Sequence, residues 1–282
     1  MSTTPSYSEV VETARSYYNS DDADNFYFHV WGGEDIHIGL YQDEQEPIAD
    51  ASRRTVERIA SKLDNLGPDS YVLDVGAGYG GAARYLARTY GCKVVALNLS
   101  EKENERDRQM NREQGLDHLI EVVDGNFENL PYDSDTFDVV WSQDSFLHSG
   151  HRDKVISEAA RVLKPGGELI FTDPMQADDC PEDVLQPVYD RIHLSSLGSI
   201  GFYREQAARN GLKEIEIEDL TERLPVHYGR VREELTRNRE DLVNRVSEEY
   251  IDRMITGLGH WVDAGNKGYL SWGILHFRKT AD

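Results

Sequence analysis

The sequence is poor in cysteine and lacks the spacings that hold metals. Only Cys92 and Cys180 occur in 282 residues, which excludes a disulfide framework and a thiolate metal site. Neither an H-E-x-x-H pattern nor a P-loop is present, and isolated carboxylate clusters are typical of a solvated face. We therefore expect two reduced cysteines that serve only in packing, and chemistry that requires no metal.

Positive charge is also scarce. Thirty Lys and Arg stand against 52 Asp and Glu, and only eight of the thirty are Lys, so the formal net charge is −22. That charge disfavours a nucleic acid or an anionic membrane as partner and leaves a small-molecule substrate. An acidic, Lys-poor surface suits high ionic strength, as in a saline cytoplasm, although an ordinary acidic bacterial protein has a similar balance.

Long apolar runs are missing. No stretch reaches the roughly 18 apolar residues of a membrane span, and the opening residues 1–20 lack the basic and apolar regions of a signal peptide. We expect a soluble protein of the cytoplasm with no membrane segment.

What the chain does have, from residue 70 onward, is a regular alternation of short apolar runs with helical patterns. The apolar runs are YVLDV (71–75), KVVALNL (93–99), LIEVVDG (119–125), FDVVWS (137–142) and GELIFTD (167–173). Such alternation predicts an α/β fold, a parallel sheet with helices on both faces. Before it, 25–41 fits neither period and predicts a lid or active-site loop, followed by a helix from Pro47 to Gly67-Pro68. After residue 173 we expect helical regions at 183–210 and 221–263 and strands at 212–220 and 269–279.

The stretch LDVGAGYGG (73–81) follows the first apolar run. Gly76, Gly78 and Gly81 satisfy the G-x-G-x-x-G pattern of dinucleotide folds, a weak match by itself. Asn98 stands where such folds carry an acidic residue, and Asp74 would repel a diphosphate. The loop also follows a long aromatic-rich segment in the sequence, whereas dinucleotide folds often begin with the glycine loop.

S-adenosylmethionine, a sulfonium without phosphate, meets these objections. Its methionine part can lie against glycines that lack a Cβ. Asn98 can bond the ribose hydroxyls, and the DGNF turn can reach adenine through Asn126 and the Phe127 backbone. Each Asn alone is more simply a turn residue. Their shared position at the carboxyl ends of successive strands reverses that preference, because such sheets bind ligands there.

The motifs LDVGAGYGG, ALNLS, DGNF, FDVVWSQDSFLH and RVLKPGGELIFTD resemble the class I S-adenosylmethionine-dependent methyltransferases over roughly residues 70–175. This resemblance implies a Rossmann-like, seven-stranded sheet whose last strand is antiparallel. The residues that we assign to the methyl donor are Asp74, Gly76, Gly78, Gly81, Asn98, Leu99, Asn126, Phe127, Ser142, Gln143, Tyr27, Trp31 and His37.

Further segments, most of them outside residues 70–175, resemble a particular family within the class I methyltransferases. WSQDSFLHSG, FTDPM, DRIHLSSLGSIGFYR, HYGRV and GLGHWVDAGNKGYLSWGILHFRK look like the sarcosine and dimethylglycine N-methyltransferases that make the osmolyte glycine betaine. This resemblance spans nearly the whole chain. In that family the segment FYFHVWGGEDIHIGLY closes over the cofactor, which implies lid contacts from Tyr27, Trp31 and His37. A more distant likeness of SQDSFLH is to phosphoethanolamine N-methyltransferases, whose Asp and His at this spacing serve the amine.

Methyl transfer to nitrogen needs an aligned and neutral amine. With a pKa near roughly 10, few amines are neutral at pH 7, so the site must accept a proton or select the neutral minority. Asp144 and His148, four apart at the start of a predicted helix, can face one cleft. We expect His148 to accept or relay the proton and Asp144 to orient it or attract the ammonium; the alternative is a helix cap and a packed histidine.

Substrate recognition requires a cation and aromatic rings. Arg offers a bidentate fork to a carboxylate, and Arg191 is favoured over Arg204, although most arginines must balance surface acid. Tyr27, Trp31 and Tyr203 can form a cage for the developing ammonium, or can be core.

These observations predict an N-terminal helical lid segment (1–66) and a methyltransferase domain (67–282) with a substrate lobe at about 176–265. The expected activity converts dimethylglycine, and sarcosine too, to glycine betaine. The alternatives are phosphoethanolamine methylation, which calls for further cations, and a non-catalytic module that binds S-adenosylmethionine.

Overall fold

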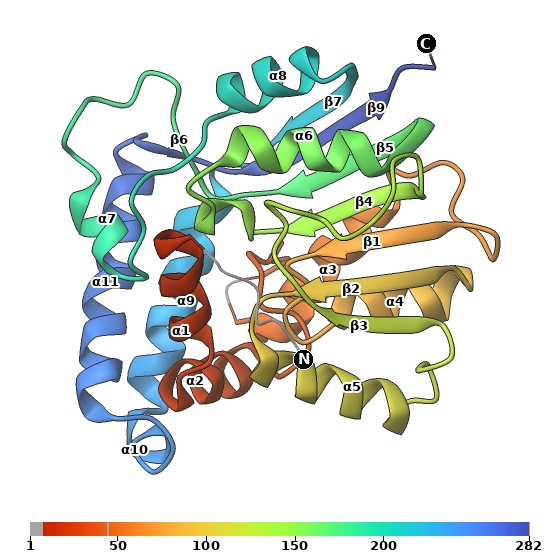
Figure 1. Ribbon diagram of the computed structural model, residues 1–282. Coiled ribbons are helices and arrows are strands. Elements are labelled where there is room, and N and C mark those ends of the chain that lie inside the picture. The colour runs from red at the N-terminus through yellow and green to blue at the C-terminus, as the bar shows by residue number, and fades with distance from the viewer. Residues whose placement is uncertain (1–7, 44, 282) are drawn as a thin grey trace.

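A seven-stranded sheet forms the centre of the part of the chain that the structure describes (Figure 1). The computed structural model describes residues 8–43 and 45–281. The strands lie in the order β3-β2-β1-β4-β5-β9-β7. Their bounds are β1 Tyr71–Val75, β2 Lys93–Asn98, β3 Ile120–Asp124, β4 Phe137–Gln143, β5 Leu163–Thr172, β7 Leu212–Asp219 and β9 Gly273–Lys279.

The direction of the strands matches the sequence prediction. β1 to β5 pair in parallel, as expected for apolar runs that are separated by helices. β9 is antiparallel to both of its neighbours, β5 and β7. A Rossmann-like sheet of seven strands with the last strand antiparallel is therefore confirmed.

Helices cover both faces of this sheet and keep its apolar side chains from water. α3 (Ile48–Ala60) and α4 (Gly81–Tyr90) pack on one face, where Ile59 and Leu86 belong to the same buried cluster as Trp141. α6 (Arg152–Val162) and α8 (Ile200–Arg209) pack on the other face. α5 (Glu101–Glu113) lies beside β2 and β3.

A helical lobe stands beside one end of the sheet, at the left of Figure 1. It consists of α1 (Glu9–Tyr18), α2 (Asp21–Trp31), α7 (Gln186–Asp190), α9 (Arg223–Arg237), α10 (Arg239–Leu242) and α11 (Glu248–Asn266). Its apolar cluster includes Phe26, Leu235 and Trp261, all fully buried. A two-stranded sheet of β6 (Met175–Gln176) and β8 (Leu270–Ser271) joins the lobe to the main sheet.

Several predicted boundaries differ from the structure. The expected loop 25–41 is helical through Trp31, because Ser20 caps α2 and Gly32, with φ of 90°, ends it. The region 183–210 splits into α7 and α8 with non-helical residues between them, and 221–263 holds α9, α10 and most of α11. α3 ends at Ala60, before the Gly67-Pro68 stop. No helix among residues 8–43 and 45–281 is long and apolar enough to cross a membrane.

Candidate active site

The glycine turn after β1 lines a first cavity, of about 80 Å³, at the carboxyl ends of β1 to β4. Gly76 and Gly78 adopt φ of 76° and 56°, which glycine tolerates best. A Cβ on Gly76 would lie 2.1 Å from the Ser145 hydroxyl. The amides of Gly76 and Ala77 donate to the Leu97 carbonyl, at 2.8 and 3.2 Å. Two amides of the turn are therefore already bonded and do not face a diphosphate.

A buried amide and carboxylate stand together at the end of β2. Asn98 donates through Nδ2 to Glu103 Oε2 at 2.8 Å, and both side chains line the first cavity. Glu103 Oε1 has no hydrogen-bond partner in the described part of the chain. Burial raises the pKa of Glu103 to about 8. The pair offers both donor and acceptor capacity to a ligand with neighbouring hydroxyls.

Sequence reasoning missed Glu103, because it occupies the N3 position of a capping box that begins at Ser100 and so has a purely structural explanation. Ser100 caps α5 by accepting from the Glu103 amide at 3.2 Å. The Glu103 side chain turns instead toward Asn98. The sequence carries one signal that could have identified Glu103. No acidic residue stands at the end of β2, but Glu103 stands in the first turn of the helix that follows.

The turn after β3 and the end of β4 close the first cavity. Leu99, Asn126 and Phe127 line it, as predicted. Gln143 also lines it; its Oε1 accepts from the Trp141 indole at 3.1 Å, while its Nε2 is buried without a partner in the described residues. Gln143 thus keeps an unused donor beside the cavity.

Three residues predicted to contact the cofactor lie behind this wall. Asp74 is buried beneath the turn, and burial together with the charges of Asp107 and Asp35 raises its pKa well above the usual value. Gly81 begins α4, where a Cβ would lie 2.2 Å from Asp35 Oδ1. Ser142 donates to the Val75 carbonyl at 2.8 Å. These three residues therefore support the glycine turn from behind and do not line the first cavity.

A second cavity, of about 40 Å³, adjoins the first. Because a single water needs roughly 10–15 Å³, this space suits a small molecule. Trp31 lines it but not the first cavity. The side chains that line both cavities are Tyr18, Tyr27, Ile36, His37, Asp144 and His148.

Tyr18 and His148 form a hydrogen-bonded pair on this shared wall. The Tyr18 hydroxyl lies 2.8 Å from His148 Nε2, with the two rings edge to face. Burial, followed by the charges of Arg191 and Arg152, lowers the pKa of His148 to about 3. His148 is therefore neutral at pH 7. Nothing in the sequence pointed to Tyr18, because α1 reaches this wall only through tertiary packing.

Asp144 does not orient His148. It lies in a turn with φ of 51°, before the short 3-10 helix η1 (Phe146–His148), so the predicted helix start is wrong. Its carboxylate accepts from the Ile38 amide at 2.7 Å and from the Trp272 indole at 2.8 Å. Asp144 therefore ties residues 32–41 to β4 and places its carboxyl group beside both cavities, where burial raises its pKa.

Arg191, the residue expected to anchor a carboxylate, follows α7 and lines the second cavity. It is buried, and its Nε and Nη1 have no hydrogen-bond partner within residues 8–43 and 45–281. Its guanidinium lies 5.0 Å from the ring centroids of Tyr228 and Trp261. A Cβ on Gly257 of α11 would lie 2.6 Å from Arg191 Cγ, so the glycine leaves room for this side chain.

The structure does not bring Tyr203 and Arg204 to either cavity. Tyr203 is buried in the apolar cluster under α8, where its hydroxyl donates to Asp173 at 2.7 Å. Arg204 lies on the outer face of α8 and pairs with Glu214 at 2.8 Å, with about half of its side chain exposed. Both belong to α8, which covers the sheet instead of joining the lobe.

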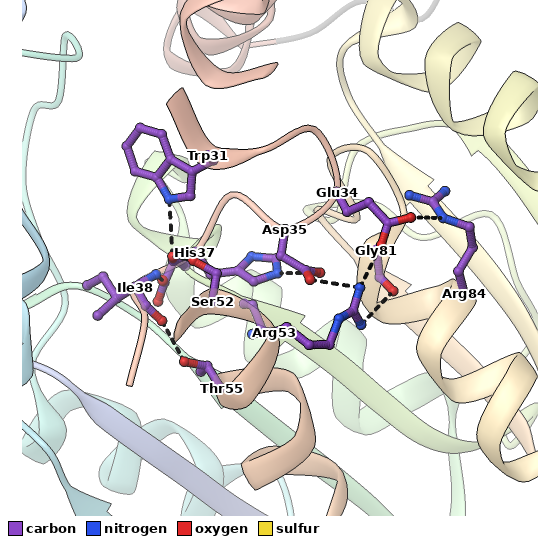
Figure 2. A network of polar contacts seen from close by, with 12 residues as sticks. Trp31, Glu34, Asp35, His37, Ile38, Ser52, Arg53, Thr55, Gly81 and Arg84 are labelled. Carbon is purple, nitrogen blue, oxygen red and sulfur yellow. Dashed lines mark hydrogen bonds and ion pairs between the residues drawn. The ribbon is translucent and has the colours of Figure 1, made fainter. Parts of the chain in front are cut away.

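Residues 32–41 cross the two cavities and are fastened to α3, as Figure 2 shows. The His37 carbonyl accepts from the Trp31 indole at 3.2 Å and from Ser52 at 2.9 Å. Arg53 pairs with Asp35 at 2.8 Å. Residues 32–41, part of the segment expected to act as a lid, are thus docked against α3. No cluster of metal-ligating side chains occurs in the described residues.

Comparisons with known proteins agree with this geometry. A family model described as a methyltransferase domain matches residues 73–171. The chain is 68% identical over 271 residues to a sarcosine/dimethylglycine N-methyltransferase of Halorhodospira halochloris, covering 96% of this chain and 97% of that protein. It is 55% identical to the enzyme of the same name from Aphanothece halophytica, covering 96% and 98%. A crystal structure of a candidate sarcosine dimethylglycine methyltransferase from Galdieria sulphuraria superposes with a TM-score of 0.89 at 43% identity, covering 94% and 100%.

Proposed function

The chain belongs to the sarcosine/dimethylglycine N-methyltransferase family, and on that premise we propose that it methylates dimethylglycine, and sarcosine too, to give glycine betaine. S-adenosylmethionine is the methyl donor, and it supplies an electrophilic methyl group on a sulfonium. Betaine is an osmolyte, which suits the acidic composition of the chain.

The observation that carries the proposal is the buried Arg191 with two unpartnered nitrogens in the second cavity. Burying an unsatisfied charged donor costs free energy that a bound anion can recover. A carboxylate matches the planar fork of the guanidinium. The shared wall places the amine of such an amino acid next to the first cavity.

The residues of the first cavity fit the methyl donor. Asn98 and Glu103 suit the two ribose hydroxyls, and Gln143 Nε2 suits the methionine carboxylate. Asn126 and Phe127 line the same cavity, which supports a contact with adenine. The fit needs no amide of Gly76 or Ala77, since both are bonded to Leu97.

The rings of Tyr18, Tyr27 and Trp31 line the second cavity, which supports a role for them around the amine as it gains positive charge. Ring faces stabilise a cation that cannot donate a hydrogen bond, as a quaternary ammonium cannot. Holding the amine against these rings also contributes alignment for an in-line displacement. Tyr203, which was expected in this cage, is replaced by Tyr18.

The pKa of His148 bears on how the amine becomes neutral. Moving a proton from an ammonium of pKa near roughly 10 to an imidazole of pKa about 3 costs about 9 kcal/mol. We infer that the site selects the neutral amine, and that His148 and Tyr18 position it. A neutral imidazole adds no positive charge beside the methyl that is transferred.

Phosphoethanolamine fits this site less well. Among the described residues that line the second cavity, Arg191 is the only Lys or Arg. Burial lowers the pKa of His148 and of His227 to about 3, so neither adds a cation. A phosphate dianion would therefore meet a single cationic side chain in this cavity, whereas it calls for more than one.

Turnover with glycine, sarcosine, dimethylglycine and phosphoethanolamine at equal concentrations tests the proposal. We expect betaine from dimethylglycine by mass spectrometry and the highest kcat/KM for sarcosine or dimethylglycine. A preference for the phosphate ester, or binding of S-adenosylmethionine without transfer to any amine, would reject it.

A further inference from the structure

His227 of α9 has its proton position fixed by residues 39 and 41. The Gly39 amide donates to His227 Nδ1 at 3.1 Å, and an amide nitrogen can act only as donor. The Tyr41 hydroxyl lies 3.0 Å from the same nitrogen. Nδ1 is therefore an acceptor without a proton, which places the proton of the neutral ring on Nε2.

The ring is neutral because it is fully buried. Burial, together with the charges of Arg191 and His37, lowers the pKa of His227 to about 3. Its Nε2–H has no partner in the described part of the chain, and His227 lines the second cavity. A buried donor without a partner is destabilising, so a site that keeps one is suited to a ligand acceptor.

The acceptor can be identified from the groups that share the cavity. Arg191 brings two further unpartnered donors to it, whereas both oxygens of Asp144 already accept hydrogen bonds from Ile38 and Trp272. Three unpartnered donors around a space of about 40 Å³ match an anion with two oxygens. They do not match an amine, whose lone pair must remain free to attack the methyl group.

We propose that His227 is a substrate-binding residue that shares the carboxylate of the amino acid with Arg191, donating from Nε2–H to one carboxylate oxygen. This inference rests on the proposed function. It also links substrate binding to the docking of residues 39 and 41, because their contacts with Nδ1 keep the proton on Nε2.

Two substitutions separate the two ring nitrogens. His227→Asn places an amide oxygen near the position of Nδ1 and so keeps an acceptor for Gly39, but it removes the donor at Nε2. His227→Gln keeps a donor near Nε2 and loses the acceptor. His276→Asn is the matched control, because His276 is also buried but bonds Glu168 between β9 and β5, away from both cavities.

The measurement compares dimethylglycine with N,N-dimethylglycinamide, which lacks the carboxylate. For His227→Asn we expect KM for dimethylglycine to rise about tenfold, with KM for the amide and the affinity for S-adenosylmethionine within about twofold of wild type. His227→Gln should keep KM for dimethylglycine closer to wild type than His227→Asn does, and the control should change neither value. Equal rises for acid and amide, or no change in His227→Asn, would overturn the proposal.

Calorimetric titration of the wild-type protein with dimethylglycine, in the presence of S-adenosylhomocysteine, distinguishes the two levels of inference. No binding to wild type would remove both the proposed function and the role of His227. Binding to wild type together with undiminished binding to His227→Asn would remove the role of His227 alone.

Discussion

The two cavities differ in how far apart their residues lie along the chain. Much of the first cavity comes from residues 76–148, each group following a strand of the parallel sheet. The second draws residues from 18 to 228 and depends on packing of α1, α7 and α9 against the turn after β4. The first cavity is therefore formed mainly by the sheet and the turns after its strands, whereas the second is formed mainly by packing of the helical lobe.

They differ also in how their polar groups are satisfied. In the first cavity the amides of Gly76 and Ala77 are bonded to Leu97, and one oxygen of Glu103 and the amide nitrogen of Gln143 lack a partner among the described residues. The second keeps nitrogens of Arg191 and His227 that have no hydrogen-bond partner among the described residues. A site with buried unpaired donors rejects analogues that lack the matching acceptor, because those donors then stay unsatisfied. Discrimination between substrates should therefore reside in the second cavity.

Arg191→Ala should have the largest effect on the amino-acid substrate with the least effect on the methyl donor. Removing the charged partner of the carboxylate should lower kcat/KM for dimethylglycine about a thousandfold, from a loss of roughly 4 kcal/mol. Affinity for S-adenosylmethionine, measured by calorimetry, should stay within about threefold of wild type. A loss of donor affinity as large as the loss in kcat/KM would mean that the cavities are not independent.

Gly257→Ala gives a milder form of the same change. The added methyl group would crowd Arg191 Cγ without removing the guanidinium. We expect KM for dimethylglycine to rise and the melting temperature to fall, because the new Cβ would lie 2.6 and 2.8 Å from Arg191 Cγ and Cβ, which cannot easily move. An unchanged KM would show that the guanidinium keeps its place despite the added methyl group.

The pH dependence of kcat/KM should be set by the substrate and not by His148. With a pKa of about 3, below the usual value near 6.5, His148 stays neutral between pH 6 and 8 and gives no inflection there. If the site selects the neutral amine, kcat/KM for dimethylglycine should rise about tenfold per pH unit, roughly a hundredfold across that range. A flat profile would show that the zwitterion binds and loses its proton within the site.

The sequence predicted the first cavity better than the second for a physical reason. Gly76, Asn98 and Asn126 each follow an apolar run, and the carboxyl ends of parallel strands meet at one edge. Tyr18 and His227 carry no such local pattern, because tertiary packing alone brings α1 and α9 to the site. Arg191 was favoured from the chemistry of a carboxylate, and the same reasoning kept Arg204 as the alternative.

Glu103→Ala should weaken binding of S-adenosylmethionine in the first cavity and leave binding of the amino acid in the second cavity unchanged. It leaves Asn98 Nδ2 without its carboxyl partner and removes the group proposed to bond a ribose hydroxyl, so we expect a rise of about tenfold in the Kd for S-adenosylmethionine. KM for dimethylglycine, measured at saturating methyl donor, should not change. An unaltered Kd would show that Asn98 contacts the ribose without help from Glu103.

The smallest effect is expected for Arg204→Ala, and it tests the assignment of the carboxylate anchor. Arg204 pairs with Glu214 on the surface of α8, and exposed pairs of this kind contribute roughly 0–1 kcal/mol to stability. KM for dimethylglycine and the Kd for S-adenosylmethionine should both match wild type, with a melting temperature lowered by a few degrees at most. If Arg204→Ala raised KM while Arg191→Ala did not, the anchor would lie on the sheet side of the molecule, and the assignment of substrate recognition to the lobe would fail.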